Sequence, residues 1–160
     1  MKILKTIKID KPIDTVWKVF VEDFESADVW MKDVVKSYAK TEGVIVDGAS
    51  MSGRVCEISE KPNSMYFDET ITAVDKANHT ITIEVIPTNA PFVMPIKKNT
   101  LTVRMKSLSD AQTEFVWDAT VELKPLAFFL TPLLKIGIGK LHGSVVDEMK
   151  YFTETGKTLN

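Results

Sequence analysis

Hydrophobic positions follow two different periods along the chain, and the change of period separates a sheet region from a helical region. Between Val34 and Leu123, apolar and polar residues alternate, as they do in a half-buried β-strand. Sequences rich in Gly, Pro, Asn and Asp interrupt this alternation and are typical of turns. We therefore predict six strands in this region: 34–41, 49–58, 65–74, 80–86, 97–106 and 113–123.

The flanking segments add one strand and the helices. Residues 3–9 alternate as a first strand, and Asp14 and Thr15 then supply side chains that favour a helix start. A second short helical turn is expected over 25–31. After Pro125 the apolar spacing becomes helical, with Pro132 near a kink or a new start. The stripe of this last helix is Leu134, Ile138, Leu141, Val145, Met149 and Phe152.

This order of elements predicts an α+β fold. Seven antiparallel strands would form a curved sheet, with two short helices after the first strand and the long C-terminal helix across the concave face. At 160 residues, the chain is expected to form a single domain, 1–160.

Strand alternation predicts which side chains face the helix. A short loop at 76–78 would pair Ile71 with Ile83 and Ala73 with Ile81, and would place Glu69 opposite Val85 on the inner side. Phe67 shares the face of Glu69. An inward carboxylate is costly unless it is paired, hydrogen-bonded or wetted.

The last hairpin offers two registers. In one register Leu101, Val103 and Met105 share the inner face with a row on the next strand that includes Trp117. A slip of one residue would turn Asp118 inward in place of Trp117. Alternation favours Trp117 and leaves the second register open.

Two features point to a pocket without identifying its occupant. The last helix carries Gly137, Gly139 and Gly143, and each costs roughly 1 kcal/mol relative to alanine. These glycines make room for a ligand, make room for close helix–sheet packing, or are simply tolerated. Segment 87–95 holds three prolines around Phe92 and two further apolar residues, and is interpreted either as a lid over a pocket or as a loop folded onto the core.

Composition narrows the classes of partner. A net charge of −2 without a dense Lys/Arg cluster argues against nucleic acid. The longest apolar run, 126–134, is far shorter than the ~20 residues of a membrane span, so no stable membrane insertion is expected. The start of the chain lacks the apolar core of a signal peptide. Together with the single cysteine, Cys56, this predicts a cytosolic protein without disulfides.

The chain as a whole resembles the START-like helix-grip (SRPBCC) superfamily, in its polyketide cyclase/dehydrase-like branch. The residues that carry the resemblance are 9–20, Trp30, Gly48 with Arg54, Glu69 followed by Asp75, Trp117 and 132–134. The resemblance implies a large hydrophobic cavity between the sheet and the last helix. Members bind, carry, sense or chemically alter lipophilic molecules, so the fold alone does not define a function.

Receptor members of the superfamily suggest further positions. By this resemblance Lys32 would meet a ligand carboxylate, Glu69 and Asp118 would be polar cavity positions, and 59–64 and 87–95 would be mobile loops. The characteristic gate sequence of the receptors is absent, so hormone sensing is not supported.

Candidate chemistry is sparse. Glu69 and His142 are the candidate catalytic residues, for acid–base work inside an apolar pocket. The alternatives are a structural ion pair for Glu69 and a helix-surface position for His142. The two histidines and Cys56 lack the spacing of a metal site. The glycines at 137–143 lack the strand–helix–strand context of a dinucleotide loop. No metal and no cofactor are expected.

The leading hypothesis is therefore a carrier or sensor that binds a small hydrophobic ligand. A cyclase/dehydratase-like enzyme and a protein-interaction module using the apolar 87–95 loop remain as alternatives, and the sequence leaves ligand identity and oligomeric state undetermined. The expected ligand-binding residues are Lys32, Phe67, Glu69, Ile71, Ile83, Phe92, Leu101, Val103, Trp117, Leu134, Ile138, Leu141 and Val145.

Overall fold

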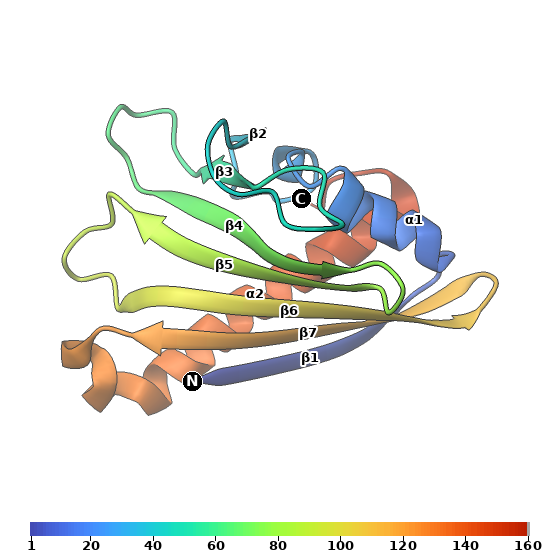
Figure 1. Ribbon diagram of the computed structural model, residues 1–160. Coiled ribbons are helices and arrows are strands. Elements are labelled where there is room, and N and C mark those ends of the chain that lie inside the picture. Colours follow the sequence, from blue (N-terminus) through green and yellow to red (C-terminus); the bar gives the residue numbers. More distant parts are fainter. Residues whose placement is uncertain (160) are drawn as a thin grey trace.

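A curved antiparallel sheet forms most of the protein (Figure 1). The computed structural model describes residues 1–159, with their side chains except those of Leu126 and Phe128. The strand order is β1-β7-β6-β5-β4-β3-β2. The strands are β1 (Lys2–Ile9), β2 (Lys36–Ala39), β3 (Gly53–Glu57), β4 (Tyr66–Asp75), β5 (Thr80–Thr88), β6 (Ile96–Ser109) and β7 (Gln112–Leu123).

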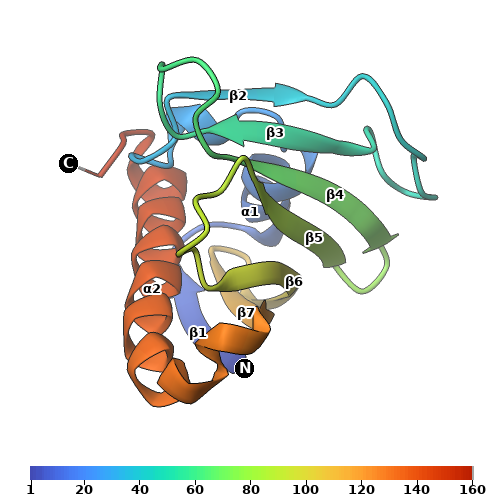
Figure 2. The same cartoon turned by 90° about the vertical axis from the view of Figure 1, so that its left-hand side faces the viewer.

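Helices cover one face of this sheet. Figure 2 shows the long helix α2 (Thr131–Thr155) running along one side of the curved strands. The shorter helices are α1 (Ile13–Trp17), which continues into the π-helix η1 (Lys18–Glu22), and the 3-10 helices η2 (Ala27–Val29) and η3 (Pro125–Leu130). Pro132 lies in the first turn of α2, where its missing N–H is tolerated, so the new start is confirmed. The predicted α+β architecture is confirmed.

Register analysis was right at two of the three predicted β4–β5 pairs. Ile71 pairs with Ile83, and Glu69 pairs with Val85. The expected pairing of Ala73 with Ile81 is wrong, because a bulge between Ile71 and Ala73 shifts the register of the hairpin. Val74 takes the place opposite Ile81, and Ala73 becomes exposed.

The β6–β7 hairpin resolves the choice between Trp117 and Asp118. Val103 pairs with Trp117, and both side chains are buried. Asp118 points to the outer face, where its carboxylate lies 3.1 Å from the guanidinium of Arg104. Alternation therefore gave the correct inward residue, and the cavity-facing role implied for Asp118 is wrong.

Several element boundaries differ from the predictions. β2 and β3 are shorter than expected, because turns with glycines of positive φ (Gly43 and Gly48) occupy much of the connection between them. β5 instead runs on to Thr88, since Pro87 pairs with Phe67 at the end of the β4–β5 ladder.

Of the three interpretations of the α2 glycines, simple tolerance fits the structure, since none of them lines the cavity or packs closely on the sheet. A Cβ built at Gly137 or Gly139 would meet no atom within 4 Å, and one at Gly143 would meet only the flexible end of Lys5. Gly53 is different, because a Cβ there would lie 1.9 Å from the backbone oxygen of Glu69. Close approach of β3 to β4 therefore requires glycine at position 53.

This contrast predicts opposite outcomes for two alanine substitutions. Gly53→Ala should lower the free energy of unfolding by about 3 kcal/mol or more, because the backbone of β4 must move to admit the methyl group. Gly137→Ala should raise it by up to about 1 kcal/mol, since alanine favours helix and the site is open. Urea unfolding of both variants measures this. Similar effects of the two changes would show that strand spacing does not limit position 53.

Candidate functional site

A cavity lies between the concave face of the sheet and α2. Its volume is about 150 Å³. Its walls come from η1, the segment around η2, strands β3 to β7 and α2. The lining residues are Phe20, Trp30, Met31, Asp33, Val34, Arg54, Cys56, Ile58, Phe67, Glu69, Ile83, Val85, Asn99, Leu101, Trp117, Leu141, His142, Val145 and Glu148.

Part of the predicted set meets at this cavity. The candidates that line it are Phe67, Glu69, Ile83, Leu101, Trp117, Leu141, His142 and Val145. Ile71, Val103 and Ile138 are buried in the core, and Leu134 packs against it. Phe92 is 84% exposed.

The misplaced candidates have a common cause. Trp17, Phe20 and Val21 from the short helices join the same core cluster as Ile71 and Val103. These helices therefore fill one end of the concave face, and the cavity occupies the part that they leave open. Alternation identified the face correctly but contained no information about how far along it the short helices reach.

Some lining residues were missed although the sequence carried a signal for them. Arg54, Cys56 and Ile58 alternate along one face of β3 and the residues after it. Asn99 lies two residues before Leu101 in β6, and therefore on the same face. Glu148 follows Leu141 by two helical turns. The spacing along each element would therefore have added these positions to the predicted set.

A buried ion pair joins β3 and β4 on the wall of the cavity. Arg54 and Glu69 are directly paired in the ladder, and Arg54 Nε donates to Glu69 Oε2 at 2.8 Å. Arg54 Nη1 also donates to the carbonyl oxygen of Phe24 at 2.7 Å, and the guanidinium lies 4.1 Å from the centre of the Phe24 ring. The inward carboxylate predicted from alternation is thus neutralised by the strand beside it.

His142 faces the cavity from α2 and is only 8% exposed. The indole Nε1–H of Trp117 donates to His142 Nδ1 at 2.8 Å. Because an indole nitrogen only donates, Nδ1 must be unprotonated, and a neutral ring carries its proton on Nε2. Burial, with a smaller contribution from the charge of Lys5, lowers the pKa of His142 to about 4. Near neutral pH the ring therefore presents an N–H donor at Nε2, for which no acceptor occurs among the described residues.

Lys32 was expected to meet a ligand carboxylate, but it pairs with Glu148. Its Nζ lies 3.7 Å from Glu148 Oε1, and its backbone N–H donates to Oε2 at 3.2 Å. Ser144 Oγ also donates to Glu148 Oε1, at 2.9 Å. Lys32 is not among the lining residues, whereas Glu148 is. Within the described part of the chain, the cavity wall therefore contains no cation without a carboxylate partner.

The remaining reactive group is inert. Burial, with the charge of Glu69, raises the pKa of the Cys56 thiol to about 12, which disfavours the thiolate. Among residues 1–159, no group of three or more His, Cys, Asp or Glu side chains is placed to hold a metal ion.

Residues 1–150 match the family described as polyketide cyclase / dehydrase and lipid transport. The chain belongs to this family, and the START-like helix-grip identification made from the sequence is confirmed. A search of the curated proteins finds no match.

Solved structures share the fold at low identity. The crystal structure of Ara h 8.0201 superposes with a TM-score of 0.71 at 15% identity, covering 96% of this chain and 97% of that chain. A START superfamily protein from Mycobacterium smegmatis gives a TM-score of 0.67 at 15% identity, with 96% and 94% covered. Norcoclaurine synthase from Thalictrum flavum, crystallised with dopamine and hydroxybenzaldehyde, gives 0.56 at 13% identity, with 95% and 85% covered.

The state of His142 predicts a specific pH dependence of stability. Its pKa is about 4 in the fold against 6.5 in the unfolded chain, so the unfolded chain binds the proton first as the pH falls. This contribution to stability is complete above about pH 6.5 and declines towards about pH 4. The loss should reach about 3 kcal/mol. In His142→Gln, which keeps an acceptor for Trp117, the decline over this window should be smaller by that amount. Urea unfolding across the window tests this, and identical profiles would contradict the assignment.

The burial of the Arg54–Glu69 pair predicts that removing its arginine costs more stability than removing the arginine of an exposed pair. Arg54→Met should lower stability by about 3–5 kcal/mol, because Glu69 would remain buried without its cation. Adding Glu69→Gln should restore much of this loss. Arg104→Met breaks the more exposed pair with Asp118 and should cost less than about 1 kcal/mol. Denaturant unfolding of these variants measures the difference, and equal losses for the two arginines would show that burial does not strengthen the Arg54 contact.

Proposed function

We propose that the protein binds a small lipophilic molecule in the cavity between the sheet and α2, as a carrier or sensor. The observation that carries this proposal is the mainly apolar lining of a space that remains open beside a closely packed core. Contact with Phe67, Ile83, Leu101 and Val145 would remove apolar ligand surface from water, at roughly 25 cal/mol per Å². The family description, which includes lipid transport, supports the same role.

The polar atoms of the cavity favour a neutral ligand that carries an oxygen acceptor. His142 Nε2–H is a free donor, and Asn99 Oδ1 is a buried acceptor without a hydrogen-bond partner among the described residues, so a hydroxyl group could accept from the first or donate to the second. Glu69, Glu148 and Asp33 place carboxylates on the wall, while the charges of Arg54 and Lys32 are already paired. A carboxylate ligand would lack a cation there, whereas a hydroxyl or carbonyl oxygen would satisfy the donor.

The same geometry weakens the cyclase/dehydratase-like alternative. The Glu69 carboxylate is held by Arg54, and the Nδ1 lone pair of His142 is occupied by Trp117. His142 therefore has no free lone pair for a substrate proton, and the charge of Glu69 is shared with Arg54. A donor at Nε2 would orient a bound oxygen, so binding without chemistry fits these residues better.

The domain organisation and the location of the protein are part of this proposal. We take residues 1–160 as one ligand-binding domain, since the sheet and α2 contribute to the same hydrophobic core. A cytosolic location remains a prediction from the lone cysteine.

Ligands with a common ring system test the proposal. Calorimetry should detect binding of 2-naphthol, weaker binding of 2-methylnaphthalene, which cannot accept the hydrogen bond, and none of 2-naphthoate. Val145→Phe, which places a ring in the cavity, should weaken 2-naphthol binding by about ten-fold or more. The matched control is Val44→Phe, at a site that is 80% exposed and outside the cavity lining, and it should bind as the wild type does.

The outcomes separate the two parts of the proposal. Equal binding of 2-naphthoate would refute the preference for a neutral ligand and leave the cavity as the binding site. Binding that survives Val145→Phe, or no binding of any aromatic or aliphatic probe together with native mass spectrometry showing no co-purified molecule, would refute the function itself.

A further inference from the structure

One end of the protein exposes large hydrophobic side chains that the cavity does not use. Residues 91–94 form a turn, closed by the bond from Met94 N–H to the Pro91 carbonyl, and Phe92 and Val93 project from it with exposures of 84% and 83%. Beside it, η3 and the first turns of α2 expose further large side chains. These are Phe129 at 90%, Leu130 at 55%, Leu133 at 70% and Ile136 at 62%. We call these six side chains the apolar end.

The two segments of the apolar end are neighbours in space. Ile96 pairs with Leu123 at the ends of β6 and β7, and Lys124 N–H donates to the carbonyl of Pro95 at 2.8 Å. Figure 1 shows the β5–β6 connection and η3 at the same end of the sheet. Several large apolar side chains exposed side by side mark an interaction site rather than ordinary surface.

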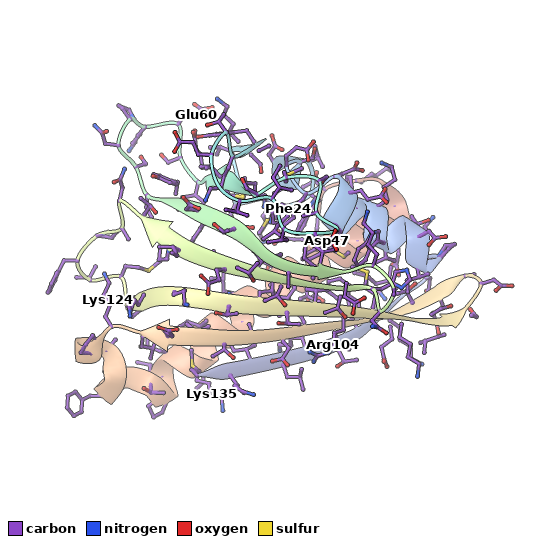
Figure 3. All side chains as sticks on the ribbon, viewed as in Figure 1. Phe24, Asp47, Glu60, Arg104, Lys124 and Lys135 are labelled. Carbon is purple, nitrogen blue, oxygen red and sulfur yellow. The ribbon has the colours of Figure 1, made fainter. Side chains whose placement is uncertain are left out.

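The charges within the segment that carries η3 and the first half of α2 have one sign, and the nearby carboxylate of Glu122 is paired with Lys97 and Lys98. Residues 123–146 contain Lys124, Lys135 and Lys140 and no Asp or Glu, although the whole chain has a net charge of −2. Figure 3 labels Lys124 and Lys135 at this end. Ion pairs of these lysines are absent among the described residues. Projecting hydrophobic side chains with lysines beside them are what an anionic bilayer surface accepts.

The same charges argue against a second copy of the chain. A symmetric contact between two apolar ends would bring the lysines of both copies together without carboxylates from the same segment. Such a contact would be repulsive, whereas anionic headgroups would be attracted to every lysine.

We propose that the apolar end docks the protein onto the surface of anionic lipid bilayers. The docking is peripheral, since no helix of residues 1–159 has the length and hydropathy needed to cross a membrane. Phe92, Val93 and Phe129 enter the boundary between headgroups and acyl chains, and the lysines contact the phosphates. Leu141 continues this surface to the cavity, because it is 50% exposed and also lines the cavity.

Vesicle co-sedimentation tests the proposal with the full chain. The wild type should bind vesicles of phosphatidylcholine mixed with phosphatidylserine better than vesicles of phosphatidylcholine alone, and added NaCl should weaken the binding. Phe92→Ser combined with Phe129→Ser should reduce binding about ten-fold or more. The matched control is Val44→Ser with Ile45→Ser, because both residues are exposed and belong to the β2–β3 connection, away from the start of α2 in Figure 2. This control should bind as the wild type does.

A second pair of variants tests the charges. Lys135→Glu with Lys140→Glu should lose about ten-fold or more of the binding to phosphatidylserine vesicles. Lys76→Glu with Lys106→Glu, on the hairpins at the opposite end, makes the same change in net charge and should retain most of it. All of these positions are exposed, so circular dichroism should confirm folded variants.

Three results would overturn the proposal. The first is a wild type that binds neither kind of vesicle. The second is a loss of binding that is equal in test and control variants. The third is a wild type that forms dimers or binds a protein through the apolar end while ignoring vesicles. Each leaves the cavity-binding role untouched, because ligand binding is measured without lipid.

Discussion

The ion pair between Arg54 and Glu69 is the contact on which the character of the cavity depends. The register places the two residues opposite each other on β3 and β4, so strand pairing alone brings the carboxylate and the guanidinium together. The same guanidinium donates to the Phe24 carbonyl and lies on the Phe24 ring, which ties the segment after η1 to β3. The Arg54 side chain therefore neutralises Glu69 and also fixes the segment around Phe24 against the cavity wall. Without it, a buried charge would oppose an apolar guest.

The rest of the concave face is divided between filled and open space. At one end, aromatic and aliphatic side chains of α1 and η1 pack onto Ile71 and Val103. At the other, α2 contributes Val145 and His142 but leaves a space between itself and β4 to β6. Two hydrogen-bonded pairs, Arg54–Glu69 and Trp117–His142, contribute to the polar part of that space. In each pair the partner occupies a lone pair or a charge of a candidate catalytic residue, which supports the proposed binding role over acid–base chemistry.

The fold was largely predictable because it rests on local patterns. Period-two alternation placed Glu69 opposite Val85 and turned Trp117 inward, and the change to helical spacing after Pro125 gave α2. The bulge after Ile71 escaped because nothing in the alternation requires it. The site was only partly predictable. Which part of an apolar face is filled depends on where α1 and η1 pack, and that is a long-range contact.

The positions of the polar residues in the site also depend on long-range contacts that a sequence pattern does not contain. Arg54 and Asn99 share the period of the inner face, but their side chains alone suggest the outside. The partner that makes burial of Arg54 acceptable, Glu69, is in another strand, and only pairing of the strands reveals it. His142 is similar, since its tautomer follows from an indole that lies 25 residues earlier in the chain.

The first half of α2 is packed less tightly than the second half. Gly137 and Gly139 lie in open space and contribute no packing, so this stretch is held less firmly than the second half, where Val146 and Met149 are buried. A helix with weak propensity and few contacts is the part of a structure that opens at least cost. That stretch begins in the apolar end and leads along α2 to Leu141, which is half-exposed and lines the cavity. For the proposed lipid surface and the proposed cavity, this stretch offers a short path along which a hydrophobic ligand would not pass through bulk water.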